Sequence, residues 1–301
     1  MQEKLKIALD ELRTLMLGAQ VLFGFQFRAL FEKGFDRLDA LERGLLAAAI
    51  LLMASVLGIL IAGPAFHRLV EHGEATGRML RIATDLAGIA LLPFALSLGC
   101  DASVVLARIA GPGLGLATGA VLVLLALGFW YALALVIREQ EGSRMVDHRT
   151  EHVPIRTKID QMLTEGRVIL PGAQALLGFQ LIAMLTESFD ALPASSKAVH
   201  ILATIAVALA IVLLMTPAAL HRLGFAGEAS QRMLALGSRM ITAALLPLGA
   251  GIAADTHVAI ARITENLGLG AAAGIAVFLL LAALWYVWPL GVALSRKATP
   301  A

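Results

Sequence analysis

Long apolar runs separated by short polar stretches dominate the chain. A helix needs about 20 mostly apolar residues to cross the hydrocarbon core of a membrane, and eight runs approach or exceed that length. They are Thr14–Phe31, Gly44–Phe66, Ile82–Cys100, Ile109–Ile137, Val168–Thr186, Ala198–Leu220, Met233–Ala254 and Asn266–Leu294. The pattern predicts an all-α fold, a polytopic membrane bundle of eight transmembrane helices.

The eight runs fall into two similar sets. The segment MLGAQVLFGFQF at 16–27 returns as LPGAQALLGFQL at 170–181, an offset of 154 residues. The same offset pairs Asp36 with Asp190, His67 with His221, Arg68 with Arg222, Pro93 with Pro247, Asp101 with Asp255 and Arg108 with Arg262. The register slips near Pro64 and Pro217, and again by the aromatic pairs Trp130-Tyr131 and Trp285-Tyr286. This long shared register indicates a tandem duplication.

The duplication divides the chain into two four-span units. We expect a first repeat at 1–137, a charged cytoplasmic linker at 138–157, a second repeat at 158–295 and a short tail at 296–301. Because each repeat has an even number of spans, both insert the same way up, as parallel repeats. The first repeat opens with an amphipathic segment that includes Leu5, Leu9 and Leu12, which either lies in the membrane interface or extends the first span.

Charged residues predict the orientation. Lys and Arg are more frequent in the N-terminal segment, the loop after the second span of each repeat, the linker and the C-terminal tail than on the opposite side. Positive residues favour the cytoplasmic side. We therefore expect a multi-pass protein of the cell membrane with both termini in the cytoplasm.

Composition supports a membrane protein. The chain is 59% hydrophobic and 15% charged, with a mean hydropathy of +0.83, whereas soluble domains are about 25% charged. A net charge of +2 gives no reason to expect nucleic acid as a partner, and a single cysteine, Cys100, excludes an intrachain disulfide. The expected partners are the lipid bilayer, including anionic head groups, and further copies or a membrane complex.

Two glutamines interrupt the first span of each repeat: Gln20 and Gln26 in the first, Gln174 and Gln180 in the second. An amide in hydrocarbon needs hydrogen-bond partners for two donors and an acceptor, so each is expected to face protein. One interpretation is that these glutamines bond neighbouring helices together, with Gly18 and Gly24 allowing close approach. The other is that Gln20 and Gln174 meet at the axis between the repeats and line a polar path.

Two opposite charges occupy equivalent positions in the third spans, Asp85 and Arg239. The uncharged parts of these spans are too short to leave both residues outside the membrane. If the third spans face each other across the axis, these residues form an intramembrane ion pair.

A His-Arg pair closes the second span of each repeat, in PAFHRL (His67, Arg68) and AALHRL (His221, Arg222). At the cytoplasmic interface such residues contact lipid phosphates. Histidine also titrates near neutral pH, so a pH-sensitive gate is a second interpretation. Haem ligation by the two histidines is disfavoured, because no second pair lies deeper in the membrane.

The Gly-x-Gln first span, with Arg13 or Arg167 before it, and the His-Arg end of the second span are similar to a family of small bacterial four-span membrane proteins of unknown function. Those proteins usually carry one copy, and the resemblance covers nearly the whole chain outside the linker. It implies the fold and a membrane location, and it brings no established activity or site residues.

No HExxH, P-loop or CxxC motif is present, so we expect neither an enzyme nor a bound metal or cofactor. Two-fold repeats with equivalent polar residues favour a channel or transporter for a small ion or solute, with its path at the repeat interface. The alternative is a non-transporting scaffold or accessory subunit, in which the polar residues only hold helices together.

Overall fold

The computed structural model describes residues 2–132, 153–221, 225 and 228–298. Within this part of the chain every regular element is a helix, as predicted. The long helices are α1 (Gln2–Ala29), α2 (Ala40–Leu69), α3 (Gly77–Ala110), α4 (Pro112–Leu127), α6 (Ile155–Ala183), α8 (Ala194–Ala219), α9 (Gln231–Thr264), α10 (Leu267–Ala282) and α11 (Trp288–Ala298). The short ones are η1 (Phe35–Arg37), η2 (Gly128–Ala132), α7 (Glu187–Asp190) and η4 (Ala283–Val287).

Seven of the described helices are long and apolar enough to cross a membrane. They are Ala40–Leu69, Gly77–Ala110, Pro112–Ala132, Ile155–Ala183, Ala194–Ala219, Gln231–Thr264 and Leu267–Ser295. Large apolar side chains such as Ile109 and Leu124 lie on the outer surface, where hydrocarbon suits them better than water. The chain is therefore a multi-pass membrane protein. α1, with Gln20, Gln26 and Arg28 in its sequence, is not among the seven, so the eighth span stays a prediction.

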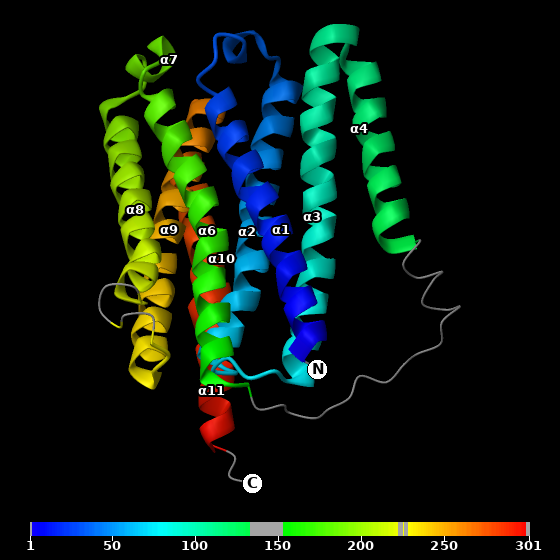
Figure 1. Ribbon diagram of the computed structural model, residues 1–301. Helices are drawn as coiled ribbons and strands as arrows, with labels where there is room; N and C mark the ends of the chain where they lie inside the picture. The colour runs from blue at the N-terminus through cyan, green and yellow to red at the C-terminus, as the bar shows by residue number, and fades with distance from the viewer. Residues whose placement is uncertain (1, 133–152, 222–224, 226–227, 299–301) are drawn as a thin grey trace.

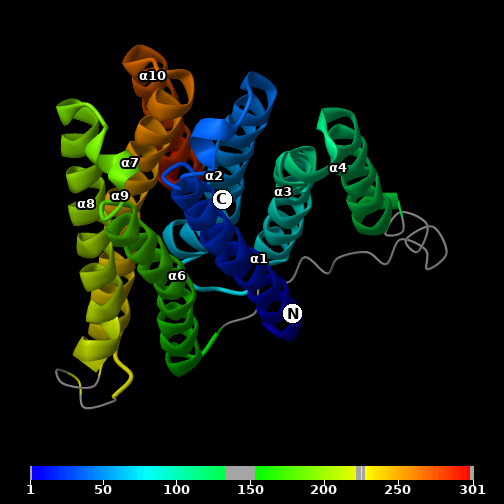
Figure 2. The same ribbon diagram turned by 90° about the horizontal axis from the view of Figure 1, so that it is seen from above.

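Successive long helices run in opposite directions, except that α10, η4 and α11 follow one another in a single direction, and the start of α1 and the end of α11 lie at the same end of the bundle (Figure 1). We call this the terminal end. α1 and α6, the first helices of the two repeats, pack directly against each other. They lie between α2 and α3 on one side and α8 and α9 on the other (Figure 2).

The N-terminal amphipathic segment is an extension of α1. Leu5, Leu9 and Leu12 are at most 1% exposed and belong to the main core. The corresponding face of α6, which includes Ile159 and Met162, is buried in the same way. Of the two interpretations open for the first segment, the structure therefore supports helix extension.

The two repeats share details of secondary structure. The third helix of each starts at a hydroxyl cap: Thr76 Oγ1 accepts from Met79 N at 3.0 Å, and Ser230 Oγ accepts from Met233 N at 3.1 Å. Such caps satisfy amide groups that a helix start leaves free. The π-helical turns η2 and η4 also occupy equivalent positions and contain the Trp-Tyr pairs.

The second register slip lies in the turn between the third and fourth helices. Gly111 alone joins α3 to α4, whereas Glu265 and Asn266 join α9 to α10. Beyond this turn, the Trp-Tyr pairs of the two repeats again occupy equivalent positions in the structure. Tyr131 donates to the Gly88 carbonyl, and Tyr286 donates to the Thr242 carbonyl, which is the position equivalent to Gly88.

The packing between repeats is unequal. α2 contacts α9, α10 and η4 of the second repeat, and Trp285 Nε1 donates to the Gly58 carbonyl at 2.9 Å. No comparable contact joins α8, the equivalent of α2, to α3 or α4 among the described helices. α3 and α4 instead lie on the side of the bundle that faces away from α8 and α9 (Figure 2). Accordingly, 61% of the residues in the most apolar stretch of α2 are buried, whereas 28% are buried in that of α8.

Candidate functional site

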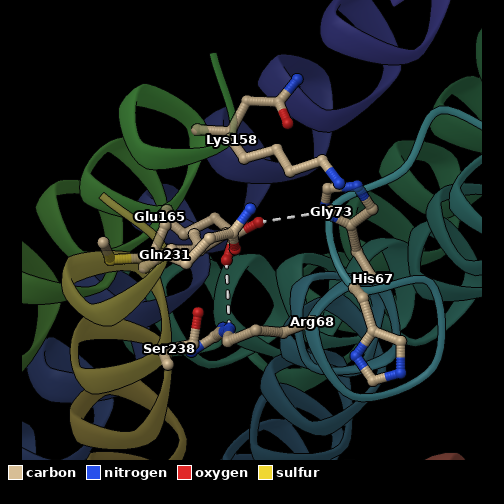
Figure 3. Close-up of a pocket in the computed structure, with 12 residues that line it drawn as sticks. His67, Arg68, Gly73, Lys158, Glu165, Gln231 and Ser238 are labelled. Atoms are coloured by element: carbon tan, nitrogen blue, oxygen red, sulfur yellow. Dashed lines mark hydrogen bonds and ion pairs between the residues drawn. The ribbon is translucent and has the colours of Figure 1, made fainter. Parts of the chain in front are cut away.

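A buried ionic cluster lies at the terminal end, where three helices meet. The end of α2 supplies His67 and Arg68, and α6 supplies Glu165. His67 Nδ1 lies 3.3 Å from Glu165 Oε1, and Arg68 Nε lies 3.2 Å from Glu165 Oε2. The three side chains are 3%, 6% and 3% exposed, respectively. Figure 3 shows the Glu165 carboxylate between the side chains of His67 and Arg68.

Arg13 of α1 adds a further cation. Its side chain is 7% exposed, forms an ion pair with Asp10 and lies close enough to Glu165 to interact electrostatically. Nε and Nη2 of Arg13 have no hydrogen-bond partner among the described residues. The cluster therefore joins the first helices of both repeats to α2. We call Arg13, His67, Arg68 and Glu165 the Glu165 cluster.

A cavity of about 190 Å³ opens beside this cluster. His67, Arg68 and Glu165 line it, together with His72, Lys158, Gln161, Gln231 and Ser238. Arg68 Nη1 and Nη2, His67 Nε2 and Gln161 Oε1 are buried without a hydrogen-bond partner in the described structure. A buried polar atom without a partner is unfavourable, so these atoms mark a place that suits a polar ligand or water.

Among the described residues, the second repeat does not build an equivalent cluster. Glu11 and Arg167, which correspond to Glu165 and Arg13, are exposed. His221 is half-buried and lines a different cavity with Arg156, Asp160 and Glu228. Arg222 lies outside the described residues. His67 and His221 thus have different surroundings, although the sequences around them are alike.

Two of the predicted glutamines bond a carboxylate on the third helix of their own repeat. Gln26 Nε2 donates to Asp101 Oδ2 at 2.8 Å, and Gln180 Nε2 donates to Asp255 Oδ2 at 2.7 Å. In the first repeat, Gln26 Nε2 also lies 2.9 Å from Ser97 Oγ. In the second, His200 lies beside the pair, with Nε2 3.1 Å from the Gln180 carbonyl and Nδ1 3.8 Å from Asp255 Oδ1.

The other two glutamines differ from each other. Gln20 is 3% exposed, and its Oε1 and Nε2 have no hydrogen-bond partner among the described residues. It packs on Gly172, where an added Cβ would lie only 1.8 Å from Gln20 Oε1. Gln174 is exposed on the surface. The expected meeting of Gln20 with Gln174 is therefore wrong in this structure, because the α1–α6 contact is not two-fold symmetric.

The expected ion pair between Asp85 and Arg239 is also not formed. Both side chains are exposed, and no ion pair joins them in the part of the chain that is described. The prediction assumed that the third helices face each other. Instead, α3 packs on α1, α2 and α4, whereas α9 packs on α2, α6, α8 and α10.

Several residues of these clusters were not predicted as site residues. The signal for Asp101 and Asp255 is present in the sequence, because 75 residues separate glutamine from aspartate in both repeats. No repeat signal exists for His200, whose counterpart is Leu46. Glu165 has the same residue type as Glu11, so the sequence does not distinguish the buried copy from the exposed one.

In the described residues, no three His, Cys, Asp or Glu side chains come together in a way that could hold a metal ion. The clusters can instead bind by hydrogen bonding and charge.

Comparison with known families gives one result. The sequence profile of a family of unknown function, DUF6328, matches the chain twice, over residues 2–134 and 149–289. No curated protein and no solved structure matches the chain. The double match agrees with the tandem duplication and with the predicted resemblance. The chain therefore belongs to the DUF6328 family and carries its domain twice.

Proposed function

We propose that this membrane protein conducts or transports a small ion or solute along the contact between α1 and α6. The observation that carries the proposal is a buried column of polar side chains on these facing helices. Arg13 and Glu165 lie at the terminal end, and Gln20 follows two turns farther along α1. Both amide atoms of Gln20 are buried without a partner in the described structure.

Energetics support this assignment. A buried polar group without a partner costs about 1–3 kcal/mol, and polar or ionisable residues within membranes commonly mark ion or substrate pathways. Gln20 and the Glu165 cluster are therefore the best candidates for groups that meet a passing solute. We infer no catalytic step.

The proposal includes eight spans in two parallel repeats, with both termini in the cytoplasm. α1 packs against α6, a candidate span, and both helices begin at the terminal end (Figure 1). With 28 residues at about 1.5 Å each, α1 is long enough to cross. The bias of Lys and Arg supports a cytoplasmic location for the terminal end.

Flux through proteoliposomes tests the proposal. Purified protein is assayed with protons, potassium, sodium, chloride and phosphate across roughly pH 5 to 8, where histidine changes charge. We expect Gln20→Leu to abolish flux while the matched variant Gln174→Leu keeps it. Equal flux in the two variants, or no flux for any of these ions in the unaltered protein, would contradict the proposal.

A scaffold or accessory subunit is the second candidate, and the Gln26–Asp101 and Gln180–Asp255 hydrogen bonds favour it. They join the first and third helices within each repeat, which is a structural role. On this account the protein passes no ion, and a partner complex purifies with it. Absence of both flux and a co-purifying membrane protein would contradict the scaffold.

A further inference from the structure

We propose that the cavity beside the Glu165 cluster binds a small oxyanion of the phosphate class, with Arg68 and His67 as its main donors. Binding at this cavity goes beyond transport, because it requires no flux. The ligand is either free phosphate or the phosphate group of a lipid, since both present the same chemistry.

Arg68 provides the strongest argument. Its side chain is 94% buried and lines the cavity, and its Nε is engaged by Glu165. Nη1 and Nη2 remain without a partner in the described structure. Arginine binds phosphate or carboxylate oxygens with two parallel N–H groups, so this free edge of the guanidinium suits an oxyanion.

His67 provides the second donor. Its Nδ1 faces Glu165, and its Nε2 is buried without a partner among the described residues. When Nδ1–H donates to the carboxylate, a protonated imidazole also has a proton on Nε2 to donate. Glu165 therefore lies between His67 and Arg68 and engages one nitrogen of each, while other nitrogens of both side chains stay without a partner in the described structure.

The rest of the cavity suits the same ligand. Gln231 is the first residue of α9, and the N-terminus of a helix attracts anions. Ser238 and His72 add further polar groups. Lys158 also lines the cavity, although its ammonium group is paired with Glu74. Among the described residues, Glu165 is the only carboxylate in the lining, and it already faces His67 and Arg68.

Gln161 distinguishes phosphate from other oxyanions. This residue lines the cavity, and its Oε1 is a buried acceptor without a partner in the described residues. Phosphate near neutral pH carries both P–O⁻ acceptors and a P–OH donor, whereas sulfate has no donor. The site therefore prefers phosphate to sulfate, because only phosphate satisfies Gln161 as well as Arg68.

The size of the cavity limits the ligand. Its 190 Å³ is below the 300–1,000 Å³ that is usual for pockets of drug-sized ligands. A cavity of this smaller volume suits an inorganic phosphate or the phosphate of a lipid head group. Since Glu11 and Arg167 are exposed, each chain has one such site among its described residues.

The test measures binding of phosphate and sulfate to the purified full-length protein in detergent by calorimetry at constant ionic strength. A second arm measures recruitment of phosphatidic acid from nanodiscs, compared with phosphatidylcholine alone. We expect saturable binding of one phosphate group per chain, weaker sulfate binding, and no effect of the matched variant Arg167→Gln. Binding of free phosphate identifies a solute, and binding only of phosphatidic acid identifies a lipid.

Two variants address the site itself. Ser238→Leu fills the cavity and leaves the Glu165 cluster intact, and Arg68→Gln/Glu165→Gln removes a cation and an anion together. Each should weaken binding roughly tenfold or more, and Gln161→Leu should abolish the preference for phosphate over sulfate.

No saturable binding in either arm, or unchanged binding in Ser238→Leu, would overturn this inference. A protein that binds phosphate and passes no ion would retain the site and end the proposed transport. Flux without phosphate binding would overturn the phosphate site and leave the proposed transport in place.

Discussion

Each repeat contains a glutamine whose amide donates to a carboxylate on the third helix, and a different third residue accompanies each pair. Ser97 lies beside Gln26 and Asp101, whereas His200 lies beside Gln180 and Asp255. The position equivalent to Ser97 is Gly251. The duplication has thus kept the helix-joining bond and changed its surroundings.

Removal of these amides should destabilise the protein to different extents. Gln180→Leu leaves the fully buried Asp255 without its donor, a loss of about 1–3 kcal/mol. Gln26→Leu should cost less, because Asp101 is only half-buried and a partly exposed acceptor loses less than a buried one when its donor is removed. Unfolding by SDS titration measures both. Gln174→Leu, on an exposed glutamine, is the control and should leave stability unchanged; a loss as large as that of Gln180→Leu would contradict the account.

The Glu165 cluster leads to a second prediction. Glu165→Gln removes the carboxylate that contacts both His67 and Arg68, so it leaves the buried guanidinium of Arg68 without its anionic partner. Breaking a buried ion pair in this way costs about 3–5 kcal/mol. The thermal unfolding midpoint in detergent should fall clearly for Glu165→Gln and stay constant for Glu11→Gln. If the two variants behave alike, the cluster does not stabilise the fold.

At the scale of single residues, the sequence predicts less than half of the Glu165 cluster and the two glutamine–aspartate pairs. It identifies Gln26, Gln180, His67 and Arg68 as polar residues of interest, and the repeated spacing points to the two aspartates. It cannot tell Gln20 from Gln174, because both have the same neighbours in the chain. Which copy is buried depends on the partner helix.

At the scale of the elements, the α1–α6 contact depends on two glycines. A Cβ on Gly24 would lie 2.2 Å from the Phe179 ring, and one on Gly172 would meet Gln20. Their repeat equivalents, Gly178 and Gly18, have nothing within 4 Å of an added Cβ. Small residues at helix contacts let backbones approach closely in membranes.

This difference gives matched variants. Gly24→Ala and Gly172→Ala should push α1 and α6 apart and destabilise the protein by about 1–3 kcal/mol. Gly178→Ala and Gly18→Ala should be neutral or slightly stabilising, because alanine is the better helix former. Unfolding in SDS again measures the effect. A loss of stability in all four variants would mean that both copies are in close contact.

The sequence predicts the helices well. Each expected run except the first coincides with a candidate span, since the runs are long, apolar and bounded by polar turns. The slip before the aromatic pairs is explained by a longer turn at Glu265 and Asn266. Only the three-dimensional structure shows that the Trp-Tyr pairs lie in π-helical turns.

At the scale of the whole molecule, the two repeats form a heterologous contact, in which different surfaces of equivalent units meet. α2 is enclosed by the second repeat, whereas α8 is left at the periphery. The sequence suggested that a two-fold axis relates the repeats, because similar units commonly pack through the same surface. That assumption led to the pairings of Gln20 with Gln174 and of Asp85 with Arg239, neither of which forms.

Unequal packing also explains why the described part of the chain contains one Glu165 cluster and no second copy of it. The cluster needs α1, α2 and α6 together, and the equivalent set of α6, α8 and α1 does not bring Glu11 and Arg167 inward. After duplication, the two copies of each residue are free to diverge in role. The proposed path and the phosphate site both depend on this asymmetry.

Cysteine crosslinking in native membranes tests the asymmetry most directly. In a Cys100→Ser background, the pair Gly24→Cys/Phe179→Cys is compared with its repeat-swapped equivalent, Gly178→Cys/Phe25→Cys. A Cβ on Gly24 would lie 3.2 Å from Phe179 Cγ, a spacing that a disulfide can bridge. Mass spectrometry of the linked peptides reports each bond. The account predicts rapid intramolecular disulfide formation in the first pair and none in the second; equal rates in both would contradict it.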